Sequence, residues 1–501
     1  RHARAELRPV RALSTGLLVL VICLLIGLIC WTSTEGEADG FFPAFYVALL
    51  GLQGGVLSVW CLFACGQAVT REREMKTYDF LRTTRLTAAE LLIGKVLGSP
   101  VLGYFSFLCV LPIAAVAALA AGYSVGVVFW TYVLVLVFAL FWAVCGLWLS
   151  MLVERTTVGP GLLGVIVVWP FLGIGAGFVT SPFPGFAAAT PLPALYALHD
   201  ADFVQADFRS APVFGMEIPL VALTLLLYVT FGAWLALMLL RNLKNELSEI
   251  RLLSRPQAVA FVAYFNLLFY AFLDPARVGS GGRFGVTPGG VSTAAVALNA
   301  SLLFLVGLAT LTPPEQLRRW WRLRTAGEEG YLSAQGPSWP WLIVTAVVAY
   351  IFLGAAAFAF TRGARLDEWN LGSAAVQLLV LLVYVVRDAT FLQWCMLTRI
   401  KRPILKGFLY LFLYYTAASV VAAVFYGASE PQGRLVLDLL TPFLVLFQNG
   451  GGLEATPWLY IGMGIQATVA VLLLRAISGR LSRPAAVVST AAPRGAGEAT
   501  S

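Results

Sequence analysis

Residues 71–95 read REREMKTYDFLRTTRLTAAELLIGK and lie between two long apolar segments of the chain. The sequence has 501 residues, of which 59% are hydrophobic and 12% are charged, and its mean hydropathy is +0.83. Soluble proteins carry about 25% charged residues. The composition therefore indicates a membrane protein, in which residues 71–95 form a polar surface segment between two membrane spans.

The rest of the chain is dominated by apolar runs long enough to cross a bilayer. A spanning helix needs about 20 mostly apolar residues, and such runs predict about twelve spans, six in each half. The sequence therefore predicts an all-α fold, a polytopic transmembrane helical bundle. The predicted spans are 14–31, 44–69, 96–120, 125–152, 158–179, 217–240, 257–274, 291–311, 340–360, 372–396, 405–427 and 457–475.

The basic residues are distributed unevenly between the two sides of this bundle. Most of the 34 Lys and Arg residues fall on the side of residues 1–13, which also carries 71–95 and 312–324. The first loop on the other side, residues 32–40, is acidic. Cytosolic loops of membrane proteins carry the excess of positive charge. We therefore expect both termini in the cytosol and the lipid bilayer as a partner, and no nucleic-acid partner despite a net charge of +8.

Two shorter apolar segments, residues 190–198 and 437–447, do not have the length of a span. Both contain proline, and each comes just before the last span of its half. We interpret them as re-entrant or interfacial helices on the outer side. The alternative is that they are ordinary loop residues.

The two halves of the chain share a layout. Arg8-Pro9 precedes the first span and Arg255-Pro256 the seventh, and TPLPAL and TPFLVL occupy corresponding places. Because six spans is an even number, the second copy enters the membrane in the same sense as the first. The sequence thus predicts a 6+6 parallel repeat, with a first repeat at 1–250, a second, divergent repeat at 251–484 and a disordered cytosolic tail at 485–501.

The polar segment itself has two local signals. Met75, Tyr78 and Leu81 follow a helical spacing and predict one short amphipathic helix. Thr87 and Glu90 have the spacing of a capping box, which predicts a new helix that runs through Gly94-Lys95 into the third span. The expected order is span, surface helix, turn and span, an elbow able to transmit force to a membrane helix.

A second elbow is expected after the eighth span. Thr312 is a candidate cap residue, followed by two prolines and Glu315. Arg318, Arg319 and Arg322 would face the cytosol or lipid headgroups, and Trp320-Trp321 suit a membrane interface. For both elbows the alternative interpretation is a membrane-surface helix without a protein partner.

The first elbow resembles the cytosolic signature of ABC-2 type exporter permeases. The similar residues are Glu72-Arg-Glu74, Thr77 to Leu81, Thr83-Thr84, Leu86-Thr87, Glu90 and Leu91 to Lys95, whereas Met75-Lys76 replaces a usual Gly and Arg85 a usual Pro. The resemblance implies an exporter subunit with two permease halves fused in one chain, moved by separate ABC ATP-binding subunits. The elbows would be its coupling helices, with Glu72, Arg73, Glu74, Lys76, Thr77, Asp79, Glu90, Gly94, Lys95, Glu315 and Arg318 as ATPase-coupling residues.

Catalytic chemistry is not expected on this chain. It has no G-x-x-x-x-G-K-[ST] motif, two His residues, and seven Cys residues that all lie inside apolar runs. We therefore expect no catalytic, cofactor-binding or metal-binding residues, and ATP on the partner subunit. The expected location is a bacterial inner membrane, and the transported substrate is unidentified, with a lipid-like or amphipathic molecule favoured by the few polar residues in the spans.

The tenth predicted span contains an adjacent charged pair, Arg387-Asp388. Charges inside a membrane are costly and by default indicate function. The pair either lines a translocation path or joins helices within the bundle. It also keeps a second class of function open, a secondary, ion-coupled 6+6 transporter. A third class, a non-transporting membrane scaffold, is suggested by the weaker second elbow.

Overall fold

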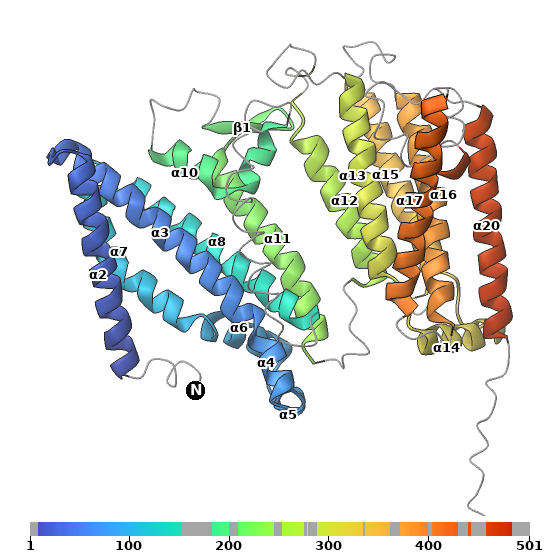
Figure 1. Cartoon of the computed structure of the whole chain (residues 1–501), viewed down its shortest axis with the longest axis horizontal. Coiled ribbons are helices and arrows are strands. Elements are labelled where there is room, and N and C mark those ends of the chain that lie inside the picture. The colour runs from blue at the N-terminus through green and yellow to red at the C-terminus, as the bar shows by residue number, and fades with distance from the viewer. Residues whose placement is uncertain are drawn as a thin grey trace, which may run out of the picture. The chain divides into compact units, whose positions relative to one another are not determined.

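The computed structural model places the chain in two compact units (Figure 1). The first comprises Arg1–Leu252 and Leu267–Thr287, and the second Leu253–Asn266 and Pro288–Ser501. The residues that the structure describes are 9–152, 183–199, 209–244, 253–274, 278, 288–333, 336–360, 371–398, 403–428, 439–441 and 457–482.

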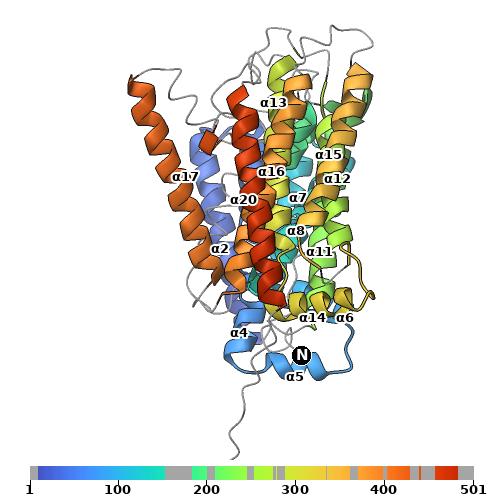
Figure 2. The same ribbon diagram turned by 90° about the vertical axis from the view of Figure 1, so that its right-hand side faces the viewer.

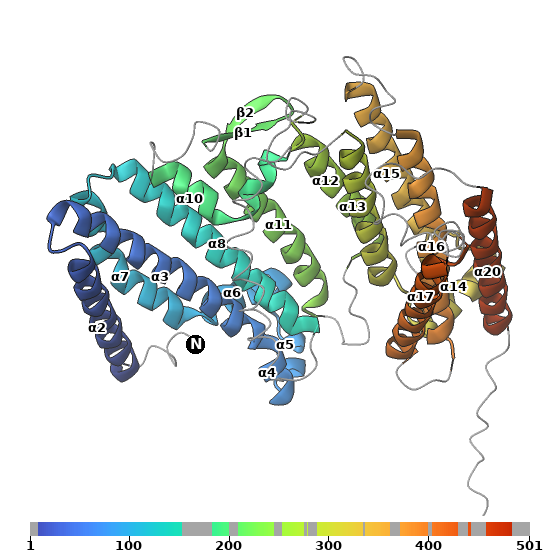
Figure 3. The same cartoon turned by 45° about the horizontal axis from the view of Figure 1, so that its top comes forward.

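The first unit consists of long helices joined by short elements at both ends. Its elements are α2 (Pro9–Ser33), α3 (Ala38–Gly66), α4 (Ala68–Glu74), α5 (Tyr78–Thr83), α6 (Ala88–Gly98), α7 (Val101–Ala120), α8 (Val125–Leu152), η2 (Pro184–Ala189), α10 (Pro191–His199), β1 (Ser210–Val213), β2 (Met216–Pro219) and α11 (Leu220–Asn242). Helix α3 packs against α7 and α8, and α8 also packs against α11. At one end of this unit lie α4 and α5, and at the other lie α10 and the two strands (Figures 1 and 3).

The second unit is built around α16, which packs against α13, α15, α17 and α20. Its elements are α13 (Pro288–Ala309), α14 (Pro314–Thr325), α15 (Trp339–Phe360), α16 (Leu371–Met396), α17 (Pro403–Ala428) and α20 (Pro457–Leu481). The two units share α12 (Arg255–Ala271), of which residues up to Asn266 belong to the second unit and later residues to the first.

Ten helices within the described residues are long and apolar enough to cross a membrane. These helices confirm the predicted all-α polytopic bundle. Helices suit a membrane because each one satisfies its own backbone hydrogen bonds in lipid. Of the two remaining predicted spans, 158–179 lies outside the described residues. The other, 257–274, corresponds to α12, whose 17 residues fall short of the length of a usual span.

Two predicted boundaries were wrong. The capping-box helix does not run into the third span, because α6 ends at Gly98 and α7 begins at Val101 after Pro100, which has no N–H to continue the helix. The span predicted from residue 217 begins at Leu220, because residues 216–219 form β2. The hairpin turns at Phe214 and Gly215, whose φ angles of 50° and 78° suit a tight turn between antiparallel strands.

The short apolar segment at 190–198 is a helix, α10, preceded by the 3₁₀ helix η2. Its re-entrant or interfacial character stays a prediction. The second short segment, 437–447, lies almost wholly outside the described residues, as does the tail predicted to be disordered. The parallel repeat and its boundaries also stay a prediction.

Close packing of α3 on α8 depends on Gly146. A methyl group at this position would overlap the carbonyl oxygen of Leu62 and lie 3.1 Å from the backbone nitrogen of Gly66. Small residues let membrane helices approach closely, where dispersion contacts and not water exclusion hold them together. The contact brings the last turn of α8 beside α4, where the first elbow begins.

Candidate functional site

The first elbow comprises α4, α5 and α6, of which α4 and α5 project beyond the ends of the long helices of its unit (Figures 1 and 2). Its first helix continues almost directly from α3. The backbone N–H groups of Val69 and Thr70, in the first turn of α4, donate to Ser150 Oγ of α8 at 3.0 and 3.1 Å. These N–H groups have no partner within their own helix. Ser150 therefore caps α4 from a neighbouring helix.

The end of α4 is a sharp reversal at Lys76. Lys76 has a left-handed φ of 57°, and Thr77 N–H donates to Glu72 O at 2.9 Å while Lys76 N–H donates to Arg73 O at 3.0 Å. This is a Schellman motif, whose left-handed position usually holds glycine. The prediction of one amphipathic helix through Met75 and Tyr78 was wrong, because the reversal separates α4 from α5.

Two side chains of the elbow bind the ends of distant helices. Arg73 Nη1 donates to Met151 O of α8 at 3.1 Å, and Tyr78 OH donates to Leu243 O at the end of α11 at 2.8 Å. The Arg73 guanidinium also lies 5.1 Å from the centre of the Tyr78 ring. The last carbonyls of a helix lack intrahelical partners and carry partial negative charge. The elbow thus terminates α8 and α11 as well as connecting α3 to α7.

An ion pair closes the elbow on itself, and a hydrogen bond joins the elbow to the end of α11. Lys95 Nζ of α6 forms an ion pair with Glu72 Oε2 of α4, and both side chains are less than one fifth exposed. Lys244, just after α11, donates to Thr84 O at 3.4 Å. A partly buried ion pair is costly to break because it leaves one charge without compensation. Glu72 and Lys95, both predicted as coupling residues, are therefore brought together by the fold.

The predicted capping box is confirmed. Glu90 N–H donates to Thr87 Oγ1 at 3.2 Å, and Thr87 N–H donates to the Glu90 carboxylate at 2.7 Å. The hydrogen bonds from the Thr87 backbone and then from its hydroxyl lower the pKa of Glu90 below its ordinary value. The Glu90 side chain is exposed. Gly94, another predicted coupling residue, is also exposed, and a Cβ at this position would have no atom of another element within 4 Å.

The outer surface of the elbow combines charge with exposed apolar side chains. Met75, Phe80 and Leu86 are 56%, 72% and 45% exposed. We call this surface the tip, and it also includes the exposed residues Glu74, Lys76, Thr77 and Asp79. Exposed apolar groups rimmed by polar residues are typical of a protein-binding surface. The predicted coupling residues did not include Met75, Phe80 or Leu86, although an apolar residue inside a polar segment was a usable signal.

The second elbow is the amphipathic helix α14 and differs in form from the first. Leu317 and Trp320 are buried against Ile477 of α20, whereas Glu315, Arg318, Arg319 and Arg322 are exposed. The predicted cap was wrong by one residue, because Pro313 occupies the N-cap position. Thr312 instead accepts a hydrogen bond from Arg255 at 2.6 Å and donates to Gly336 O at 2.8 Å.

A buried arginine holds the second elbow in place. Arg255, at the start of α12, is 5% exposed, and its guanidinium donates to Pro337 O at 2.9 Å and to Gly336 O as well as to Thr312. Gln393 of α16 exchanges two hydrogen bonds with the backbone of Thr312, at 2.7 and 3.2 Å. Arg255 satisfies several loop carbonyls at once, which its planar set of donors permits. The approach to α14 is thereby bound to both α12 and α16.

The intramembrane pair Arg387-Asp388 lies at the junction of α16, α17 and α20. Arg387 binds Asp388 Oδ1 at 2.5 Å, Tyr415 OH at 2.8 Å and Gln466 Oε1 at 2.5 Å. Tyr415 OH donates to Asp388 Oδ2 at 2.6 Å, and the two charged residues are 5% and 6% exposed. Buried charges are stable only when they are paired and hydrogen-bonded. This geometry favours the joining of helices, the second of the two interpretations of the pair.

The fold and the first elbow define a multi-pass membrane protein whose first unit presents a structured, exposed surface between two spans. A model of the ABC-2 type transporter family matches residues 8–186, which include the whole first elbow. Residues 8–186 are therefore similar to the membrane domain of ABC-2 type transporters, which is a transport permease domain and not a catalytic one. No curated protein and no solved structure matches the chain significantly.

Proposed function

We propose that this chain is the permease subunit of an ABC exporter, moved by a separate ATP-binding subunit that docks on the tip of the first elbow. The observation that carries the proposal is the combination of an exposed tip with a firmly held base. Phe80 and Met75 offer apolar contact to a partner, and Glu74 and Asp79 offer charge beside them. Protein interfaces of this kind place an aromatic residue at the centre of a polar rim.

The contacts of the elbow supply a path for force. A partner that moves α5 also moves Tyr78, which is bonded to the end of α11. Movement of α4 is passed to α8 through Arg73 and Ser150, and to α6 through the Glu72–Lys95 pair. Packed helices and satisfied polar contacts transmit displacement as rigid bodies. ATP binding on the partner would thus tilt α6, α8 and α11 together.

The second elbow would be a further coupling element through Glu315 and Arg318, which are exposed on α14. The chain would then carry two fused permease halves and accept two ATP-binding sites on partner subunits. Both termini would lie in the cytosol, with the protein in a bacterial inner membrane. An amphipathic or lipid-like substrate is supported by two largely apolar cavities in the first unit, of about 320 and 210 Å³.

The docking step is tested by Phe80→Ser in the full chain, co-expressed with candidate ABC ATP-binding subunits from the same organism. We expect copurification in mild detergent, and its loss by about tenfold or more in the variant, because an aromatic anchor dominates such interfaces. Glu74→Lys with Asp79→Lys should have the same effect. Phe214→Ser is the matched control, since Phe214 is 63% exposed at the opposite end of the same unit. Unchanged copurification and ATPase activity with Phe80→Ser would refute docking at the tip.

A further inference from the structure

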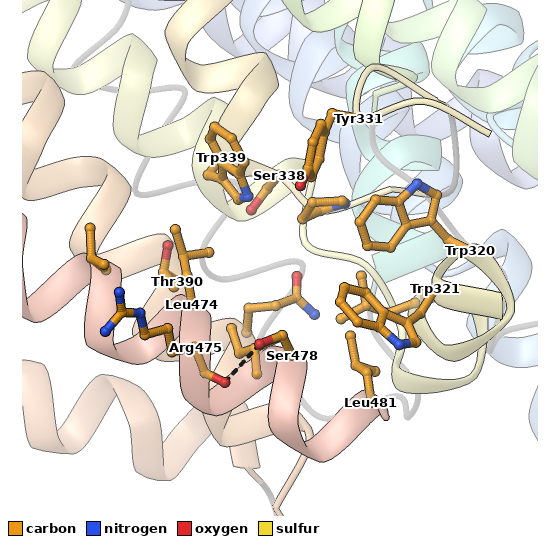
Figure 4. A pocket seen from close by; sticks show the side chains of 15 residues that line it. Trp320, Trp321, Tyr331, Ser338, Trp339, Thr390, Leu474, Arg475, Ser478 and Leu481 are labelled. Carbon is orange, nitrogen blue, oxygen red and sulfur yellow. Dashed lines mark hydrogen bonds between the residues drawn. The ribbon is translucent and has the colours of Figure 1, made fainter. Parts of the chain in front are cut away.

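The second unit contains an aromatic cavity at the end where α14 crosses α20 (Figure 4). Its volume is about 350 Å³. Trp320, Trp321 and Tyr331 line one margin, and Leu474 and Arg475 of α20 lie at the other (Figure 4). This combination of indole rings, aliphatic carbon and one cation is the composition expected for an amphipathic ligand.

Arg475 is the arginine at this cavity whose guanidinium is available to bind a ligand. It lies in the last two turns of α20 and is exposed, and within the described part of the chain its guanidinium forms no ion pair or hydrogen bond. By contrast, the guanidinium carbon of Arg324 lies 3.4 Å from the centre of the Tyr331 ring, and that of Arg480 lies 4.4 Å from the centre of the Trp394 ring. Ser478 donates to the carbonyl oxygen of Arg475 at 2.8 Å (Figure 4), which leaves the guanidinium available.

The surroundings of the cavity are positively charged. Arginines outnumber acidic residues around it, although Glu328 and Glu329 follow α14 and offset part of the charge. The arginines are Arg318, Arg319, Arg322 and Arg324 of α14 together with Arg475 and Arg480 of α20. Such a field attracts anions and repels cations.

The position of the cavity along the membrane normal follows from the helices that form it. The candidate span of α20 ends at Leu481, and α14 buries Leu317 and Trp320 while exposing Arg318, Arg319 and Arg322. A helix of this kind lies in the plane of the interface, and tryptophan prefers the same depth. We therefore expect headgroup phosphates near the level of Arg475, with acyl carbon along Val471 and Leu474.

We propose that this cavity binds one anionic phospholipid. Its phosphate lies on Arg475, its acyl chain follows Val471 and Leu474, and the tryptophans of α14 cover it. Basic pockets between membrane helices bind anionic headgroups in this way. A bound lipid bridges α14 and α20, so it braces the second elbow against its membrane helix. The inference does not depend on docking of an ATP-binding subunit to the first elbow.

For the test, the full chain is purified in mild detergent, stripped of lipid and then incubated with a probe lipid. Native mass spectrometry measures the lipid that the chain retains. Phosphatidylglycerol and phosphatidylcholine with identical acyl chains are the probes. We expect one phosphatidylglycerol to be retained in preference, and Arg475→Ala to weaken its binding about fivefold, the effect of one arginine near a membrane surface. Arg475→Lys should keep most of the preference, and Ser478→Trp, which fills the cavity, should abolish retention.

Arg322→Ala is the matched control, because Arg322 is an exposed arginine of α14 outside the cavity. Equal retention of the two lipids, or an unchanged preference in both Arg475→Ala and Ser478→Trp, would overturn the proposal. A preference lost in Arg322→Ala but kept in Arg475→Ala would assign the anion to the outer face of α14, the face that a protein partner would use, and would also overturn it. Retention of soluble glycerol phosphate without retention of phosphatidylglycerol would show a phosphate site and no lipid site, and would also overturn the proposal.

Discussion

At the scale of single residues, Lys76 occupies a backbone position that its side chain disfavours. A left-handed residue with a Cβ costs roughly 1–2 kcal/mol relative to glycine. The departure of this chain from the ABC-2 signature, which usually has Gly near this point, thus falls where the chain reverses between α4 and α5. The equivalent position after α14 is Gly327, with a φ of 81° and the same pair of backbone hydrogen bonds.

We expect Lys76→Gly to raise the thermal unfolding midpoint of the purified chain by about 2 °C, because it relieves this strain. The converse change at the second elbow, Gly327→Ala, should lower the midpoint. Differential scanning fluorimetry in detergent measures both. A lower midpoint for Lys76→Gly would show that Lys76 contributes contacts that outweigh its backbone strain.

The Arg387-Asp388 pair makes a second prediction at this scale. Asp388→Leu should destabilise the protein by about 3–5 kcal/mol, because it leaves the Arg387 cation buried without its counter-charge. Replacing both residues by Leu should recover much of the loss. A transport defect in Asp388→Asn with an unchanged unfolding midpoint would instead support ion coupling, the chemistry of a secondary transporter.

At the scale of elements, the contact of α3 with α8 is controlled by one glycine. Gly146→Ala should cost about 1–3 kcal/mol, since the added methyl group meets backbone atoms that cannot move alone. Gly55→Ala is the control, because no atom of another element lies within 4 Å of the added methyl group and alanine favours a helix. The two unfolding midpoints should move in opposite directions. Equal shifts would mean that the helices separate freely at Gly146.

The start of α6 should depend on pH through Glu90. Because folding lowers the pKa of Glu90, its capping contribution is fully present above the ordinary pKa of 4.5 and is lost as the pH falls through the lower, folded-state value. Hydrogen exchange at residues 88–92, corrected for intrinsic rates, should therefore accelerate as the pH falls below 4.5 and through the lower, folded-state pKa. Glu90→Gln should show weaker protection at neutral pH and no such acceleration. The same acceleration in that variant would assign it to another group.

At the scale of the whole molecule, the end of α12 belongs to the first unit although its start belongs to the second. Phe272 packs against Gly185 and Phe186, and Ala271 O accepts a hydrogen bond from Phe214 N–H at 3.1 Å. A fragment of residues 1–287 keeps these contacts, whereas a fragment of residues 1–252 loses them. Loss of one buried Phe alone costs about 3–5 kcal/mol.

We therefore expect the 1–287 fragment to elute as a single species in size-exclusion chromatography, and the 1–252 fragment to aggregate. Identical elution and unfolding profiles would show that the first unit needs nothing beyond residue 252. Phe272→Ala in the longer fragment separates the packing of this ring from the mere length of the chain.

The candidate site was predictable from the sequence only in part. The capping box of Thr87 and Glu90 is local, so its spacing alone identified it. The inward or outward orientation of the other residues was not local, because Arg73 and Tyr78 bind acceptors 78 and 165 residues away. A helical spacing therefore placed Met75 and Tyr78 on one stripe, although the fold exposes the first and buries the second.

The sequence alone determined the membrane-spanning character of this protein and the place of its elbows. Apolar length decides a span, because a helix in lipid must satisfy its backbone within itself, and polar residues between two spans must reach water. Only the tertiary structure decided that Phe80 is exposed at the tip, that Arg255 holds the second elbow and that Arg475 lines an aromatic cavity. These assignments depend on contacts between elements far apart in the chain, which no local pattern of residues encodes.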